Sequence, residues 1–230
     1  MARRLLHKKT SSVYTTIMVS RNSIKKYMSG GFYHLYNRGV AKNDVFLDDQ
    51  DYKVFLHCLK EYLSQPTEPT EDEIRLMKYT YLRKNYHNKI ELLSFCLMPN
   101  HFHLLIKQND PRSIEYFMRS LLIRYSSYFN KRYNRVGHLF QDVYKGILIE
   151  RESYFLWVSR YIHRNPLDLL KTNEQLCSYP YSSYPTYLGK LEIDWIKTEY
   201  ILGNTKDYRN FVEGSDKKPP LGIDKYTLEY

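Results

Sequence analysis

Two apolar stretches joined by a two-residue turn constrain the fold of this 230-residue chain more than any other feature. Residues 89–98 (KIELLSFCLM) and 101–107 (HFHLLIK) are rich in large apolar side chains, and the intervening Pro99 and Asn100 are typical of a turn. The pattern predicts a β-hairpin with a buried first strand. Because side chains alternate along a strand, His101 and His103 are expected on one face and Phe102 on the other.

The segments around this hairpin predict an alternation of strands and helices. Residues 32–38 (FYHLYNR) and 137–149 are expected as strands, and apolar residues at helical spacing predict helices over 48–63, 113–133 and 152–165. Pro166 ends the last helix, since the residue before a proline disfavours helical conformation. This order is typical of an α+β, ferredoxin-like (RRM-like) sandwich: a four- to five-stranded antiparallel sheet with helices on one face, here followed by a C-terminal helical extension.

Composition divides the chain into four expected parts. Residues 1–30 form a basic N-terminal arm, residues 31–170 the main domain, residues 171–213 the C-terminal extension and residues 214–230 a flexible tail. Short helices are also expected at 72–83, 195–202 and 206–212, and residues 179–187 (YPYSSYPTY) as a proline-broken loop.

The positive charge of the chain is concentrated in two regions. The formal net charge is +10, from 35 Lys and Arg against 25 Asp and Glu. Residues 1–30 hold 7 basic and no acidic residues, and residues 111–171 hold 11 basic and 5 acidic ones. Such clustering favours a polyanionic partner, most simply nucleic acid. The 24 tyrosines suit the stacking of unpaired bases, although composition alone explains most of them.

Several classes of protein are excluded by what the sequence lacks. No apolar run approaches the roughly 18 residues that a membrane helix needs, and the basic start has no signal-peptide core. Cys58, Cys96 and Cys177 contain no CxxC spacing, which argues against a disulfide framework and a thiolate zinc site. We therefore expect a cytoplasmic, nucleoid-associated protein.

Two short stretches carry candidate chemistry. Two imidazoles on one face of a strand, His101 and His103, can bind one divalent ion. On the predicted helix 152–165, Tyr161 and Asn165 are four residues apart and share a face, so a phenol and an amide oxygen are presented together. Each stretch taken alone is better explained by chance or by ordinary packing.

Taken together, the motifs of the chain resemble the single-tyrosine HUH transposases, specifically the REP-associated tyrosine transposases and their insertion-sequence relatives. The resemblance spans roughly residues 30–213. It rests on FYHLYNRG (32–39), FLDDQDYKVFL (46–56), CLMPNHFHLLI (96–106), RYSSYFNKRYNRVGHLFQ (124–141), RYIHRNP (160–166), YSSYPTYLG (181–189) and YRNFV (208–212).

The resemblance implies an enzyme and assigns its site residue by residue. It implies that His101 and His103 bind the metal, that Asn165 is a third ligand and that Tyr161 is the nucleophile. The implied reaction is metal-dependent cleavage and rejoining of single-stranded DNA at hairpin (palindromic) element ends, through a covalent 5′-phosphotyrosine. A mixed nitrogen and oxygen ligand set suits Mg²⁺ or Mn²⁺. Relatives include monomers and homodimers, and both remain open here.

The remaining candidate residues are DNA contacts and supporting groups. Candidate DNA contacts are basic residues of the first strand, the long helix, the segment after it and the helix expected over 152–165: Arg38, Arg119, Arg124, Lys131, Arg132, Arg135, Lys145, Arg160 and Arg164. His34 is a candidate supporting residue, and His138 and Gln141 form a spare candidate ligand pair. Asp142 and Val143 stand where relatives commonly carry Gly-Arg, which makes the DNA path beside that strand uncertain.

Alternatives to this reading differ in mechanism. Tyr125, Tyr128 and Tyr133 are rival nucleophiles, ranked below Tyr161 because none has an amide four residues on near a helix end. A domesticated, non-catalytic hairpin DNA- or RNA-binding protein on the same scaffold would need no metal. A metal-dependent phosphoesterase that uses water would form no covalent intermediate.

Overall fold

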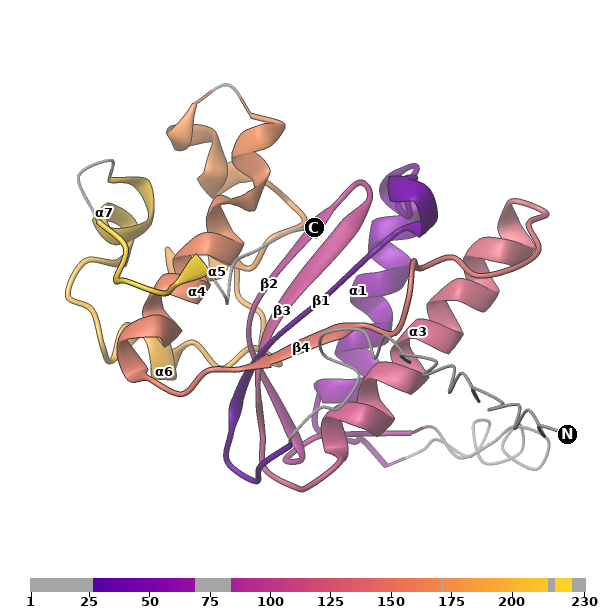
Figure 1. Cartoon of the computed structure of the whole chain (residues 1–230), viewed down its shortest axis with the longest axis horizontal. Coiled ribbons are helices and arrows are strands. Elements are labelled where there is room, and N and C mark those ends of the chain that lie inside the picture. The colour runs from indigo at the N-terminus through magenta and orange to yellow at the C-terminus, as the bar shows by residue number, and fades with distance from the viewer. Residues whose placement is uncertain (1–26, 69–83, 171, 215–217, 225–230) are drawn as a thin grey trace, which may run out of the picture.

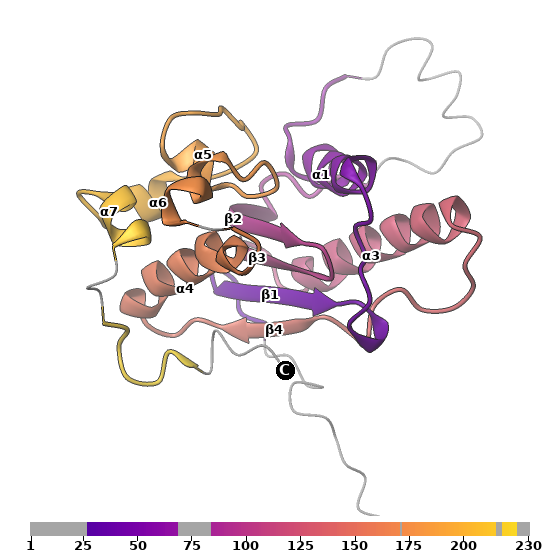
Figure 2. The same ribbon diagram turned by 90° about the horizontal axis from the view of Figure 1, so that it is seen from above.

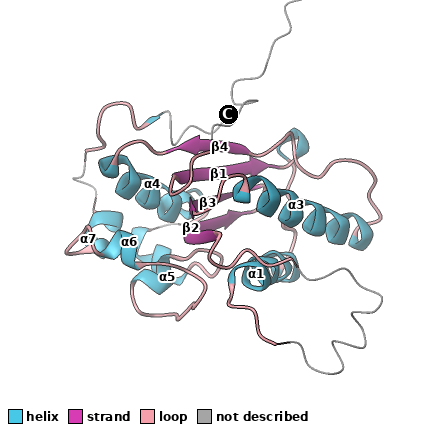
Figure 3. Ribbon diagram, turned by 90° about the horizontal axis from the view of Figure 1, so that it is seen from below, coloured by secondary structure: helices cyan, strands magenta, loops and turns pink. Residues whose placement is uncertain are grey.

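A computed structural model of the chain describes residues 27–68, 84–170, 172–214 and 218–224, and its central element is a four-stranded sheet. The strands are β1 (Phe32–Arg38), β2 (Ile90–Met98), β3 (His101–Gln108) and β4 (Lys145–Leu148). They lie in the order β2-β3-β1-β4, and all neighbours are antiparallel (Figure 3). With helix α1 between β1 and β2, and α3 between β3 and β4, this is the predicted ferredoxin-like topology.

Helices cover both faces of the sheet. On one side lie α1 (Asp49–Leu63) and α3 (Ser113–Arg132), and on the other lies α4 (Glu152–Arg164) (Figure 1). The first pair packs against Leu35, Phe102 and Leu104, which project from one side of the sheet. The prediction of helices on one face therefore describes α1 and α3. The apolar stripe of α4 packs instead on Leu93 and Leu105, which alternate to the opposite side.

The segments after α4 enlarge the core on its side of the sheet. They include the short helices α5 (Tyr184–Tyr187), α6 (Glu199–Leu202) and α7 (Tyr208–Glu213), which gather beside α4 (Figure 2). Buried side chains from all three helices join the cluster that contains α4. Among the described residues, no helix is long and apolar enough to cross a membrane.

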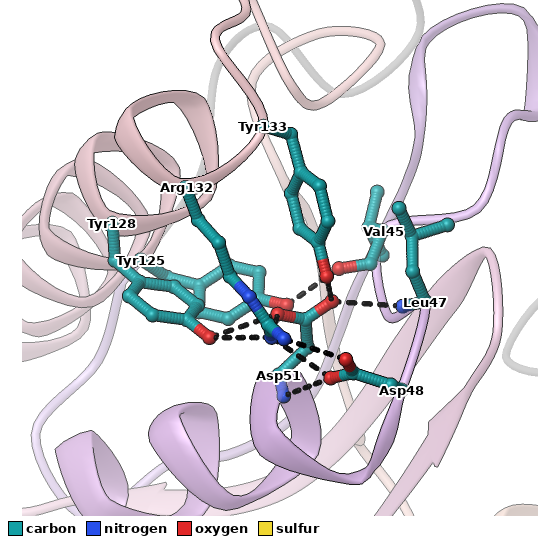
Figure 4. Close-up of polar contacts among 8 residues, drawn as sticks. All are labelled: Val45, Leu47, Asp48, Asp51, Tyr125, Tyr128, Arg132 and Tyr133. Atoms are coloured by element: carbon teal, nitrogen blue, oxygen red, sulfur yellow. Dashed lines mark hydrogen bonds and ion pairs between the residues drawn. The ribbon is translucent and has the colours of Figure 1, made fainter.

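A buried carboxylate fastens α1 to α3. Asp51 is fully buried in the first turn of α1, and its oxygens accept hydrogen bonds from the hydroxyls of Tyr128 and Tyr133, each 2.9 Å away (Figure 4). Arg132 pairs with Asp51 at 2.7 Å and with Asp48, the N-cap residue of α1, at 2.6 Å. The acidic start that predicts a helix N-terminus thus also anchors the neighbouring helix.

Several sequence predictions need correction. The strand expected over 137–149 is confined to Lys145–Leu148, because residues 137–144 turn inward to bury Leu139 and Phe140. The helices expected over 195–202 and 206–212 form only as α6 and α7, and α5 lies where a loop was expected. The helix expected over 72–83 lies outside the described residues.

The two chain ends, expected as a loose arm and tail, are packed where the structure describes them. Tyr27 lies edge-on against Tyr33, with ring centroids 5.5 Å apart, and the Gly30 N–H donates to Gln108. Near the C-terminus Ile223 is buried, and the carbonyl of Leu221 accepts a hydrogen bond from Tyr154 of α4.

Candidate active site

Strand register gathers polar side chains on the face of the sheet covered by α4. His101 and His103 project from β3 toward this face, with only 8% and 1% of their surfaces exposed. Across the ladder, Arg38 pairs with His101 and Tyr36 pairs with His103. Because paired residues project to the same side, β1 contributes its own polar row beside the histidines.

Helix α4 brings Tyr161 and Asn165 onto this row. The Asn165 Oδ1 atom lies 3.1 Å from His101 Nε2, and the Tyr161 ring stands edge-on to His103 with centroids 5.3 Å apart. The Asn165 amide also donates to the Tyr161 carbonyl at 3.3 Å, one helical turn back, which orients its oxygen toward His101. The structure thus brings together the four residues that the resemblance implies, from two elements far apart in the chain.

Each histidine of the pair has a partner on its other ring nitrogen. His101 Nδ1 lies 2.6 Å from Asn100 Oδ1, and His103 Nδ1 lies 2.8 Å from His34 Nε2. His34 is 1% exposed and stacks on His103, with ring centroids 5.0 Å apart. In metal sites such contacts to Nδ1 fix the tautomer and leave Nε2 to face the ion.

The donor set of this site is two imidazoles and a carboxamide. Among the described residues no group of three or more His, Cys, Asp and Glu side chains is arranged to hold a metal, and the third donor beside the two imidazoles is the carboxamide of Asn165. Two ligands at right angles on a cation, each about 2.1 Å from it, lie about 3 Å apart. The 3.1 Å between His101 Nε2 and Asn165 Oδ1 fits that spacing.

Basic side chains flank the histidines on the same face. Arg38 is half-buried beside His101, and Lys145 of β4 pairs with Tyr36, which places it on the far side of that strand. Lys145 also lies 3.6 Å from Asp142, the acid that stands where relatives carry Gly-Arg. Of the predicted DNA contacts, these two lie on the strands that carry the site.

The other predicted DNA contacts are not brought to the histidine pair. Arg119, Arg124, Lys131, Arg132 and Arg135 belong to α3 or follow it, on the opposite side of the sheet. Of these, Arg124 pairs with Glu61, Arg132 with Asp48 and Asp51, and Arg135 with Asn130.

Two basic residues of α4 have structural partners. Arg160 donates to the carbonyls of Phe211 and Gly214, and Arg164 donates to that of Val212, with all three distances at 2.6 Å. These bonds tie α4 to the C-terminal extension.

The spare ligand pair lies on the segment before β4, where the Gln141 N–H donates to the Arg38 carbonyl at 2.8 Å, and the rival tyrosines lie on the opposite side of the sheet. His138 and Gln141 are exposed on the segment before β4, separated by Phe140, which packs under the sheet against Phe102. The hydroxyls of the rival tyrosines form hydrogen bonds with α1 and with the segment that precedes it. Tyr125 donates to the Val45 carbonyl, and Tyr128 and Tyr133 donate to Asp51 (Figure 4).

Sequence reasoning missed Tyr36 and Asn100 as neighbours of the histidines. The Tyr36 ring lies 5.6 Å from that of His103 and 5.2 Å from that of His34. Its position two residues after His34 in a predicted strand was a usable signal, since both must share a face. Asn100 gave no such signal, because it was interpreted only as a turn residue.

Comparison with known proteins supports the resemblance. Residues 67–165 match the model of a family described as IS200-like transposases, and this span contains His101, His103, Tyr161 and Asn165. The match confirms the predicted resemblance and the predicted class of enzyme, a transposase. No curated protein matches the chain.

Solved structures with a related shape were also found. A REP-associated tyrosine transposase bound to a REP hairpin is 15% identical, with a TM-score of 0.49 over 77% of this chain and 92% of its own. A protein from Deinococcus radiodurans R1, provisionally described as a transposase, is 16% identical, with a TM-score of 0.37 over 58% of this chain and 89% of its own.

Proposed function

We propose that this chain, similar over residues 67–165 to the IS200-like transposases, cleaves and rejoins single-stranded DNA at hairpin-bearing element ends. In this reaction a divalent metal ion is required, and the intermediate is a covalent 5′-phosphotyrosine at Tyr161. The observation that carries it is the convergence of Tyr161 of α4 and Asn165, the C-cap residue of that helix, with His101 and His103 of β3. Such an activity would operate in the cytoplasm, at the nucleoid.

The metal would be held by His101, His103 and Asn165. Their nitrogen and oxygen donors suit Mg²⁺ or Mn²⁺, and a bound divalent ion would neutralise charge on the non-bridging oxygens of the scissile phosphate. His34 and Asn100 are positioning residues. Each contacts the Nδ1 atom of one histidine, which would leave the Nε2 atoms of both imidazoles to bind the ion.

Tyr161 supplies the nucleophile. Its phenol oxygen attacks the phosphorus, the bond to the 3′ oxygen breaks, and the products are a 5′-phosphotyrosine and a free 3′-hydroxyl. The phenol proton is lost to solvent and the departing oxygen takes one up. Because the phosphodiester energy is retained in the tyrosine ester, a 3′-hydroxyl can reverse the step and rejoin a strand without ATP.

Arg38 and Lys145 would contact phosphates close to the cleavage point. Both lie on the β1 and β4 side of the histidines, on the face of the sheet that α4 covers. A guanidinium binds phosphate oxygens in a bidentate manner, whereas a lysine acts as a point charge. This arrangement keeps the DNA backbone on the α4 side of the sheet.

Covalent capture tests the proposal. The chain is incubated with labelled hairpin DNA that carries single-stranded flanks of randomised sequence, with Mn²⁺, and denaturant-resistant adducts are resolved by gel. We expect an adduct with the wild type, none with Tyr161→Phe, and none without the divalent ion. Tyr36→Phe is the matched control, since it removes another phenol from the same site, and it should form the adduct.

Other outcomes would point to other functions. An adduct of equal yield with Tyr161→Phe would exclude Tyr161 as the nucleophile. Cleavage with turnover and no covalent species would indicate a phosphoesterase that uses water. A non-catalytic hairpin-binding protein would bind the DNA without cleaving it. Its Mn²⁺ binding would be absent, or would be the same in the wild type and in His103→Ala.

A further inference from the structure

A cavity of about 400 Å³ lies beside α4, at the end of that helix remote from Asn165. Its apolar wall is formed by Phe32 of β1, Phe155 of α4 and Ile149. Tyr200 of α6 closes the wall, with its ring centroid 5.8 Å from that of Phe32, which in turn lies 4.8 Å from that of Phe155. Three aromatic rings from three different elements therefore meet around one opening.

The cavity lies on the same face of the sheet as the candidate active site. Phe32 is two residues before His34 on β1, so both side chains project to that face. Phe155 precedes Tyr161 by six residues on α4, a rise of roughly 9 Å along the helix axis. A strand whose phosphate reaches Tyr161 would thus have its neighbouring nucleotides within reach of the cavity.

The chemistry of the lining suits a nucleobase. Aromatic rings supply stacking surface for a flat heterocycle, and polar groups at the rim, Arg151, Glu150 and Asn204, can bond to base edges. Small-ligand pockets combine the same features, apolar walls with few polar groups, at volumes of roughly 300–1,000 Å³. A cavity of this kind accommodates a base and excludes a duplex.

The Tyr200 ring is held in place before any ligand arrives. Its hydroxyl accepts a hydrogen bond from Lys107 Nζ at 2.7 Å, and the same ammonium lies 3.3 Å from Glu91. A ring fixed by such a tether loses little conformational freedom when a base stacks on it. The tether therefore favours a binding role for the exposed part of this ring.

We propose that the cavity bounded by Phe32, Phe155 and Tyr200 binds one unstacked base of the single-stranded DNA that passes Tyr161. The inference rests on the proposed function, because it takes single-stranded DNA as the ligand. It makes the cavity a second point of contact, beyond the scissile phosphate, at which the enzyme distinguishes a base-bearing strand from a bare backbone.

The test compares two strands of equal length, oligothymidylate and a base-free deoxyribose phosphate chain, by fluorescence anisotropy. Tyr200→Leu removes the aromatic ring and should weaken binding of oligothymidylate roughly 5- to 150-fold, the loss of one base stack. It should leave binding of the base-free strand unchanged. Tyr200→Phe keeps the ring but loses the Lys107 hydrogen bond, so it should weaken binding of oligothymidylate far less than Tyr200→Leu does and leave binding of the base-free strand unchanged. Leu202→Ala, on the same helix outside the cavity, is the matched control.

A second measurement uses the unaltered protein and so does not depend on variant folding. Oligonucleotides carrying 5-iodouracil are photocrosslinked to the wild type, and the adduct should map to peptides that contain Phe32, Phe155 or Tyr200. Wild-type binding of oligothymidylate with no Tyr200→Leu effect, or with crosslinks only elsewhere, would overturn the cavity assignment alone. Failure of the wild type to bind either strand would overturn the proposed function as well.

Discussion

At the scale of single residues, His34 tests whether the contacts around the histidine pair serve metal binding. His34→Phe keeps an aromatic ring but removes the nitrogen that lies 2.8 Å from His103 Nδ1. We expect Mn²⁺ affinity, measured by calorimetry, to fall about 10- to 100-fold, as is usual when such a partner is lost. His34→Gln restores a hydrogen-bonding group and should recover part of the affinity.

Tyr36→Phe is the control for that measurement, since it alters a neighbouring ring on the same strand face and should leave Mn²⁺ affinity unchanged. Equal Mn²⁺ affinity in His34→Phe and the wild type would show that His34 only packs. A His103→Ala variant provides the reference for complete loss of the site.

The histidine pair itself could be predicted from sequence, but its surroundings could not. Alternation along one strand is enough to place His101 and His103 on the same face. His34 and His103 are 69 positions apart, and their diagonal contact depends on the register of β1 against β3, in which His34 pairs with Leu105. Helical spacing likewise puts Tyr161 and Asn165 on one face of α4, while only the packing of Leu93 and Leu105 decides that this face meets the histidines.

At the scale of elements, Asp51 determines how firmly α1 holds α3. The carboxylate is fully buried and satisfies Arg132, Tyr128, Tyr133 and the Leu47 N–H. Asp51→Ala removes the acceptor of the two hydroxyls and of the Leu47 N–H and leaves Arg132 with Asp48 alone, so we expect the free energy of unfolding to fall by about 3 kcal/mol, measured in urea. Asp49→Ala, an exposed position in the same turn, should change it far less.

A buried histidine makes the attachment of α4 sensitive to acid. His163 is fully buried, with its ring nitrogens 2.7 Å from the Tyr208 hydroxyl and 2.8 Å from that of Ser183. Burial lowers the pKa of His163 to about 3. Because the unfolded chain takes up this proton near pH 6.5 and the folded chain does not, stability should fall as the pH drops from about 6.5 toward 3.

This contribution can be isolated by comparing two pH values. When the pH is lowered from 7.5 to 5, protonation of His163 in the unfolded chain should reduce the free energy of unfolding of the wild type by about 2 kcal/mol. In His163→Gln, which does not titrate, the difference between the two pH values should be smaller by that amount. An identical pH dependence in both proteins would mean that His163 is accessible to protons in the folded state.

Long elements follow from the sequence more faithfully than short ones. Helical periodicity places α1, α3 and α4 to within one residue at either end, because each has an apolar stripe of several turns. The short helix α5 has no such stripe and is held by burial of Tyr184 and Tyr187. The strand expected over 137–149 failed for a similar reason: Leu139 and Phe140 look like strand residues but pack into the core from an irregular segment.

At the scale of the whole molecule, the two faces of the sheet should contribute unequally to DNA binding. Lys145 lies on the face that carries the histidines, whereas Lys131 is exposed on α3, beyond the other face. Lys145→Glu should weaken binding of hairpin DNA more than Lys131→Glu. It should also lower the slope of log affinity against log salt by about 1, the value expected for one lost phosphate contact. Equal losses would instead place α3 on the DNA path.

The last prediction concerns whether one chain completes the site. Tyr161 and Asn165 lie against His101 and His103 of the same chain, so a single copy holds the nucleophile and the candidate ligands together. Mixing Tyr161→Phe, which lacks the phenol, with His103→Ala, which lacks a metal ligand, should therefore give no covalent adduct on hairpin DNA. If instead tyrosines were exchanged between subunits, the mixed dimer would contain one intact site and the adduct would reappear. A mixture of wild type with the doubly substituted chain controls for subunit exchange, because it should form the adduct in proportion to its wild-type content. A site complete within one chain is thus distinguished from a shared one by a single gel.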